Sequence, residues 1–237
     1  MARLMILALA AATTFGAVTT ASAETGPYFA ASLSYAHLDD ADIRGIDTSF
    51  GRQPGGYIAA DPGYGVNLGL GYGFDSNWRA ELELNYRRAN YKRATAGALT
   101  DADTDGSFRQ TAVFANLYYD FQPVDGGIFA GITPYVGGGV GWAHIRWDKV
   151  QTFNAVERVG HDSSDNAAAA QLMVGFSYDV PGAEGLSITT ELRHTRLLGD
   201  LSFKGRVLES RFGSFPIQTD VKDKGRTEIN IGLRRRF

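Results

Sequence analysis

The sequence predicts an all-β protein, an eight-stranded antiparallel up-and-down transmembrane β-barrel. Three observations predict it: apolar and polar side chains alternate over long stretches, long and short connections alternate along the chain, and no helical periodicity follows residue 23. Successive side chains of a strand point to opposite faces, so alternation with a period of two indicates strands with one apolar and one polar face. The stretches are long enough to cross a bilayer as tilted strands, which takes about 9–11 residues each.

The first 23 residues predict a cleaved signal peptide. Arg3 precedes an apolar run, and the small residues Ala21 and Ala23 are what a signal peptidase site needs. An uncleaved anchor is the alternative, but a spanning helix needs roughly 20 apolar residues and threonines interrupt this run. We therefore expect an exported chain in which residues 24–237 form one barrel domain.

The composition excludes several classes of function. The 237 residues hold 23 basic and 26 acidic side chains, a formal net charge of −3, and no cysteine. Binding of nucleic acid requires a clustered basic face, which this balance does not indicate. The lack of cysteine rules out disulfides. Because neither a phosphate-binding loop nor the spacing of zinc ligands occurs, we expect no cofactor and no metal.

The stretch from Gly63 to Tyr91 shows the alternation best. Two strands flank a turn at Asp75 to Asn77, and apolar side chains alternate with glycine in the first strand and with charged residues in the second. Similar alternation marks the other segments. The eight predicted strands are Tyr28–Leu38, Gly63–Phe74, Trp78–Tyr91, Phe108–Gln122, Ile132–Trp147, Ala168–Val180, Leu186–Leu197 and Arg226–Phe237.

The connections between these segments alternate in length. Successive connections of an up-and-down barrel fall at opposite ends, so all long ones share one end, as in barrels with short periplasmic turns and long external loops. Apolar residues within the first and last long connections have two interpretations. Either the strands continue beyond the membrane and these residues cover one another, or the loops form a surface for an external partner. The long connections are 39–62, 92–107, 148–167 and 198–225, and the short ones are 75–77, 123–131 and 181–185.

Charge decides which face of the strands meets lipid. A basic residue on the lipid face costs about 2–4 kcal/mol at the midplane, so the charged face must point inward. Eight strands leave an interior just wide enough for side chains to fill. The charges therefore form either a paired network that plugs the interior or the lining of a narrow pore. The charged residues expected there are Arg79, Glu81, Glu83, Arg87, Glu191, Arg193 and Glu228.

Four stretches carry a resemblance to a known family. They are GYGFDSNWRAELELNYR at 71–87, NLYYDF at 116–121, TPYVGGGVGWA at 133–143 and INIGLRRRF at 229–237. The sequence resembles the small outer-membrane β-barrels of Gram-negative bacteria, the OmpA-like and surface-antigen type. The resemblance implies a monomer in the cell outer membrane, surrounded by lipid and lipopolysaccharide, that acts as a surface antigen or adhesin without catalysis. A narrow porin for small solutes is the alternative.

The last predicted strand resembles the signal that the outer-membrane assembly machinery recognises. The family often carries an aromatic residue two positions before the end, where this chain has Arg235. The residues that the resemblance assigns to this signal are Ile229, Ile231, Leu233 and Phe237.

Two other classes of protein are alternatives to the outer-membrane barrel. A lipid-modifying enzyme would need a histidine beside a serine and an acid; His194 has Thr195 and Glu191 nearby but no serine on its face. A secreted lipocalin-type barrel also has eight strands, but it hides apolar side chains inside and shows polar ones to water. The one-sided long connections argue against the second class.

One acidic segment has the spacing that opens a calcium loop. Asp101, Asp103 and Asp105 precede Gly106 as in such loops, but the twelfth position, where a bidentate glutamate belongs, is Ala112. The segment is therefore either a specific calcium site or an acidic loop tip in water.

Overall fold

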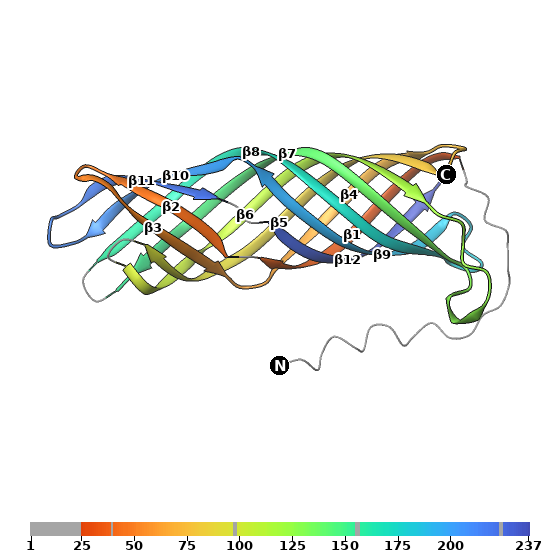
Figure 1. The fold of residues 1–237 in the computed structure, drawn as a ribbon. Helices are drawn as coiled ribbons and strands as arrows, with labels where there is room; N and C mark the ends of the chain where they lie inside the picture. The colour runs from red at the N-terminus through yellow and green to blue at the C-terminus, as the bar shows by residue number, and fades with distance from the viewer. Residues whose placement is uncertain (1–24, 39, 97–98, 155–156, 223–224) are drawn as a thin grey trace.

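The computed structural model describes residues 25–38, 40–96, 99–154, 157–222 and 225–237. The predicted signal peptide lies outside these residues. The described chain is antiparallel β-structure apart from one short 3-10 helix, η1 at Gly127–Phe129, which confirms the predicted all-β class (Figure 1). No helix among the described residues is long and apolar enough to span a bilayer. The strands are β1 Gly26–Leu38, β2 Ala41–Thr48, β3 Gly51–Ala60, β4 Gly63–Gly73, β5 Trp78–Ala96, β6 Leu99–Asp120, β7 Ile132–Phe153, β8 Arg158–Asp179, β9 Leu186–Leu198, β10 Asp200–Glu209, β11 Phe215–Lys222 and β12 Arg226–Arg236.

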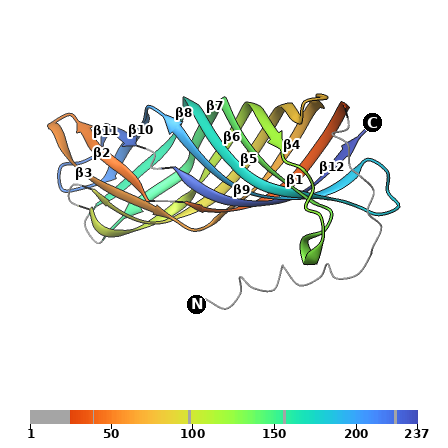
Figure 2. The same cartoon turned by 45° about the vertical axis from the view of Figure 1, so that its right-hand side comes forward.

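The strands close into two stacked rings that share β5, β6, β7 and β8 (Figures 1 and 2). In the ring that we call basal, β8 pairs with β9, and pairing continues through β12, β1 and β4 back to β5. In the ring that we call distal, β8 pairs with β10, and pairing continues through β11, β2 and β3 back to β5. The shared strands are 19 to 22 residues long, enough to run through both rings.

The structure has twelve strands where the sequence predicted eight. The difference arises in the predicted loops 39–62 and 198–225, which contain β2, β3, β10 and β11. Each of these strands continues the direction of a basal strand after a short break; a single residue, Gly199, separates β9 from β10. The backbone N–H and C=O groups of a long loop need hydrogen-bond partners. The four segments provide these partners for one another by pairing as strands. The predicted long connections 92–107 and 148–167 are also wrong as loops, because β5, β6, β7 and β8 extend through most of them. The short connections 75–77, 123–131 and 181–185 lack strands, as predicted.

The outer face of the basal ring is apolar. On β5, Leu82 and Leu84 are exposed. Glu81, Glu83 and Asn85, which alternate with them, are buried inside. The same alternation runs around the ring. Other exposed apolar side chains of this belt include Leu33, Leu68, Leu70, Val113, Leu117, Val140, Leu172, Val174, Leu192 and Ile231.

The distal ring has the opposite arrangement, with its apolar side chains inside. Phe203 of β10 is fully buried and stacks on Trp147 of β7, with ring centroids 4.2 Å apart and planes 11° from parallel. Of the two interpretations of the apolar residues in the predicted loops, mutual cover holds for Phe203, Val207 and Ile217. It does not hold for Phe50, which is exposed at the turn between β2 and β3.

The acidic segment with calcium-loop spacing is part of strand β6 and not a loop, so the expectation of a loop tip is wrong. Asp103 and Asp105 are exposed on the outer face, while Ala102 and Thr104, which alternate with them, are buried. Because the strand is extended, it does not curl its carboxylates around one point as a calcium loop does.

Candidate functional site

Inward-facing glycines leave space for large side chains in the interior of the basal ring. A Cβ at Gly137 of β7 would meet the ring of Tyr118 at 2.4 Å, and one at Gly71 of β4 would meet the ring of Tyr28 at 2.2 Å. The inward-facing glycines of these strands therefore leave room for large side chains of the neighbouring strands. The alternation of glycine with apolar residues in the sequence is the local cause of this arrangement.

Arg79 lies at the centre of the first layer, next to the short turns. Its Nε and Nη2 donate to the two carboxylate oxygens of Asp120, at 2.7 and 2.9 Å. Its guanidinium lies 4.5 Å from the ring centroid of Tyr118 and 5.2 Å from that of Tyr135, which gives cation–π contacts. Tyr28 accepts a further hydrogen bond from Nη1 at 3.2 Å. Arg79 is thus compensated by an anion and aromatic faces.

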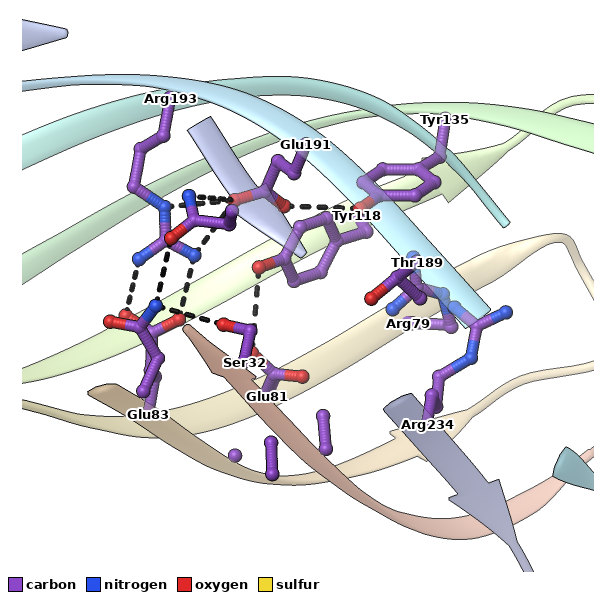
Figure 3. A pocket seen from close by; sticks show the side chains of 15 residues that line it. Ser32, Arg79, Glu81, Glu83, Tyr118, Tyr135, Thr189, Glu191, Arg193 and Arg234 are labelled. Carbon is purple, nitrogen blue, oxygen red and sulfur yellow. Dashed lines mark hydrogen bonds and ion pairs between the residues drawn. The ribbon is translucent and has the colours of Figure 1, made fainter. Parts of the chain in front are cut away.

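Arg193 organises the second layer. Its Nη1 and Nη2 donate to the two carboxylate oxygens of Glu83, at 2.6 and 2.7 Å, and its Nε donates to Glu191 at 2.9 Å (Figure 3). Glu191 also accepts from the hydroxyl of Tyr135 at 3.3 Å. One cation therefore holds two carboxylates that would otherwise repel each other.

The third layer closes the interior toward the distal ring. Arg87 forms a two-pronged ion pair with Glu228, which is fully buried. Arg226 approaches the same carboxylate at 3.8 Å and donates from Nη1 to Gln110 at 2.7 Å. The fully buried Phe114 of β6 lies opposite Glu83 of β5, and the apolar core of the distal ring lies beyond the third layer. Among the described residues, paired charges fill the interior of the basal ring and apolar side chains fill much of the distal ring.

A small polar cavity of about 50 Å³ lies between the first two layers (Figure 3). Two of its charged neighbours form no ion pair with a described residue. Glu81 accepts a hydrogen bond from the hydroxyl of Tyr118 at 3.4 Å, and Arg234 donates from Nη2 to Ser177 at 3.2 Å. The Nε of Arg234 has no partner. The cavity is therefore lined by two charged side chains that have no ion-pair partner among the described residues.

All charged residues that the sequence placed inside the barrel lie there, and each is no more than 8% exposed. The sequence analysis did not name three further charged residues of this interior: Asp120 pairs with Arg79, Arg226 approaches Glu228, and Arg234 lines the cavity. Alternation offered a signal for all three. Asp120 shares the face of Asn116, and the two arginines share the face of Glu228, two and six residues away.

The other singled-out residues lie elsewhere. Ile229, Ile231, Leu233 and Phe237 are exposed on the outer side. The grouping weighed for catalysis is not assembled, because His194 points outward while Thr195 and Glu191 of the same strand are buried inside. Within the part of the chain that the structure describes, no three histidine, aspartate or glutamate side chains gather to hold a metal ion.

A closed barrel with an apolar belt outside and a charged interior defines the class of transmembrane β-barrels. The family model described as an outer membrane protein beta-barrel domain matches residues 6–237. The chain belongs to this family, which places it in the outer membrane of Gram-negative bacteria.

Curated relatives match parts of the chain. An "Outer membrane protein" of Gluconacetobacter diazotrophicus is 30% identical over 138 residues, covering 56% of this chain and 35% of the relative. An uncharacterised protein of Brucella abortus is 28% identical over 178 residues, covering 66% of this chain and 58% of the relative. The chain thus spans about a third to three fifths of the length of these curated relatives. The outer membrane protein OprG of Pseudomonas aeruginosa has a similar fold, with a TM-score of 0.59 at 18% identity, covering 90% of this chain and 96% of that one.

Proposed function

We propose that the basal ring is an eight-stranded barrel that spans the outer membrane and that the distal ring stands outside the cell. The exposed belt of the basal ring supports this placement, because burying apolar surface in lipid removes it from water. The distal ring contains the long hairpins, which are external in such barrels. Its polar outer face suits water.

We further propose that the protein is a surface-exposed structural protein, an antigen or adhesin, without catalysis. The observation that carries this proposal is the closed interior: ion pairs around Arg79, Arg193 and Arg87, followed by the apolar core of the distal ring, occupy the path through the barrel. A barrel without a passage has its interactions at its external end. We also propose that the exposed apolar face of β12 is the surface that the assembly machinery recognises.

An aromatic cluster supplies a candidate contact surface at the far end of the distal ring. Phe50, at the β2–β3 turn, lies 5.9 Å from Phe212 and 5.2 Å from Phe215 between ring centroids. Phe50 and Phe212 are both more than 60% exposed. Aromatic residues are enriched where proteins bind partners, and a rigid barrel presents this group without the cost of ordering a loop.

Binding to cells or matrix tests the adhesin proposal. We expect whole bacteria that display the variant Phe50→Ser/Phe212→Ser to lose their binding to cells or matrix. The matched control is Ile128→Ser/Phe129→Ser, which removes exposed apolar surface at the opposite end. Unchanged binding by the first variant, or equal loss in both, would overturn the proposal.

A narrow pore is the second candidate, and the 50 Å³ polar cavity favours it. Conduction would require the pair of Arg87 and Glu228 to separate. We expect no conductance steps from the purified protein in a planar bilayer. Steady steps that change in size in Arg87→Gln/Glu228→Gln would favour the pore over the closed barrel, whereas silence from protein that shows heat-dependent gel mobility supports the closed barrel.

A further inference from the structure

Three arginines form a row on the outer face where the basal ring gives way to the distal ring. Arg88 of β5 is directly opposite Arg109 of β6, and Arg109 is directly opposite Arg146 of β7. The row is bounded by Tyr64, the partner of Arg88 on β4, and by Ser164, the partner of Arg146 on β8. Opposite residues have Cβ atoms about 4.5–5.5 Å apart, and like charges so placed repel. The row therefore needs anions.

The protein supplies only part of that compensation. Asp148 pairs with Arg109 at 2.8 Å and with Arg146 at 3.6 Å, and Asp162 pairs with Arg146 at 2.8 Å. Arg88 forms no ion pair with a described residue, and the Nε of Arg109 is buried without a hydrogen-bond partner. Two carboxylates serve three guanidinium groups, so the row keeps an excess of positive charge and free donors.

The apolar belt ends immediately below this row. Tyr86 stands two residues before Arg88 on the outer face of β5, and Trp142 stands four residues before Arg146 on that of β7; they are 43% and 61% exposed. Tyrosine and tryptophan gather where hydrocarbon meets headgroups. If the basal ring spans the membrane as proposed above, the arginines lie at the level of the outer-leaflet headgroups.

We propose that Arg88, Arg109 and Arg146 bind the phosphate groups of a phosphorylated glycolipid in the outer leaflet. Arginine forms two parallel hydrogen bonds to phosphate oxygens, and three neighbouring guanidinium groups offer several such pairs. The acyl chains would lie against the belt beneath, beside Tyr86 and Trp142. This continuity of charge with apolar surface is the reason to assign a lipid and not a free phosphate ion.

The test compares lipids bound to the purified full chain in detergent micelles by native mass spectrometry. The probes are diphosphoryl lipid A, the same lipid without phosphates, and inorganic phosphate as competitor. The variant is Arg88→Gln/Arg109→Gln/Arg146→Gln. The control, Arg158→Gln/Arg206→Gln/Arg211→Gln, removes the same charge from exposed positions at the far end of the distal ring.

We expect the row variant to retain at least tenfold less diphosphoryl lipid A than the wild type and the control, and the dephosphorylated lipid to bind all three weakly. Equal retention by the row variant would overturn the proposal, and so would full competition by millimolar phosphate, which would indicate an ion site only. The single variant Arg88→Gln repeats the test if the triple variant does not fold. Heat-dependent gel mobility of each protein, recovered from outer membranes, reports the barrel itself, so failure of the membrane placement is distinguished from failure of the lipid site.

Discussion

Strands β5 to β8 pass through two rings in which side chains are arranged in opposite ways. On β5 the outward residues change from Tyr86 to Arg88, and the inward residues change from Arg87 to Ala89. Within the same few residues, the outer face changes from apolar to charged and the inner face changes from charged to apolar. The basal ring is apolar outside and charged inside, whereas the distal ring is polar outside and apolar inside.

The proposed placement, with the basal ring in lipid and the distal ring in water, accounts for this inversion. In lipid, an outward charge is costly and the interior holds the polar groups, which must then be paired. In water, burial of apolar side chains inside the ring is the main stabilising contribution. The same strands can run through both rings because the sequence can switch which alternate positions are apolar while the extended backbone continues unchanged.

Loss of a buried cation should have the largest effect and should be confined to the basal ring. We expect Arg193→Met to lower the free energy of unfolding by about 3–5 kcal/mol, because it leaves Glu83 and Glu191 buried without their shared partner. Urea unfolding of the protein in lipid vesicles, with gel mobility as the readout, measures this free energy. Glu83→Gln/Glu191→Gln/Arg193→Met should recover part of the loss. Arg44→Gln, whose ion pair with Asp200 is about half exposed, should change stability by no more than about 1 kcal/mol.

Loss of a buried aromatic ring should affect only the distal ring. Phe203→Ala removes the side chain that stacks on Trp147 and should cost about 3 kcal/mol within the distal ring. We expect faster proteolysis within residues 198–225 while the heat-dependent gel mobility persists. Simultaneous loss of both properties would show that the two rings unfold together.

A charge added to the outer face should separate the two environments on one strand. Leu84→Arg places a cation in the belt and should cost about 2–4 kcal/mol. Asn90→Arg, on the same face of β5 but beyond the row of arginines, should change stability by about 0.5 kcal/mol or less. Similar costs at the two positions, measured as urea unfolding midpoints, would contradict the assigned boundary.

His161 should give the distal ring a dependence on pH. Burial lowers the pKa of His161 to about 4, and its Nε2 lies 2.9 Å from the hydroxyl of Thr219. The unfolded histidine takes up a proton below about pH 6.5 and the folded one only below about pH 4, so stability falls as pH is lowered through this window.

Between pH 7.5 and pH 5 we expect a loss of about 2 kcal/mol. Fluorescence of Trp147, whose ring contacts His161, reports it in a Trp78→Phe/Trp142→Phe background. His161→Gln should remove the dependence over this window, and a slope that persists in that variant would assign it to other groups.

The sequence predicted which way the side chains of the candidate site point, but not which of them pair. Alternation alone placed Arg79, Glu83 and Arg193 on the inner face, because parity within a strand is a local property. The pairing of Arg193 with Glu83 required the closed ring, because 110 positions separate them in the chain. The same alternation within a strand also predicts that Asp120, Arg226 and Arg234 point inward.

The sequence by itself determined the all-β class, the positions of the basal strands and the inward direction of their charges, because each depends on neighbours along the chain. Only the tertiary structure decided that the connections 39–62 and 198–225 are strands. Their apolar residues, such as Ile43 and Phe203, acquire a core only when β2, β3, β10 and β11 meet across a ring. The alternation in each of these segments is too weak to predict a strand by itself. The segments form strands because the four of them bury one another's apolar side chains.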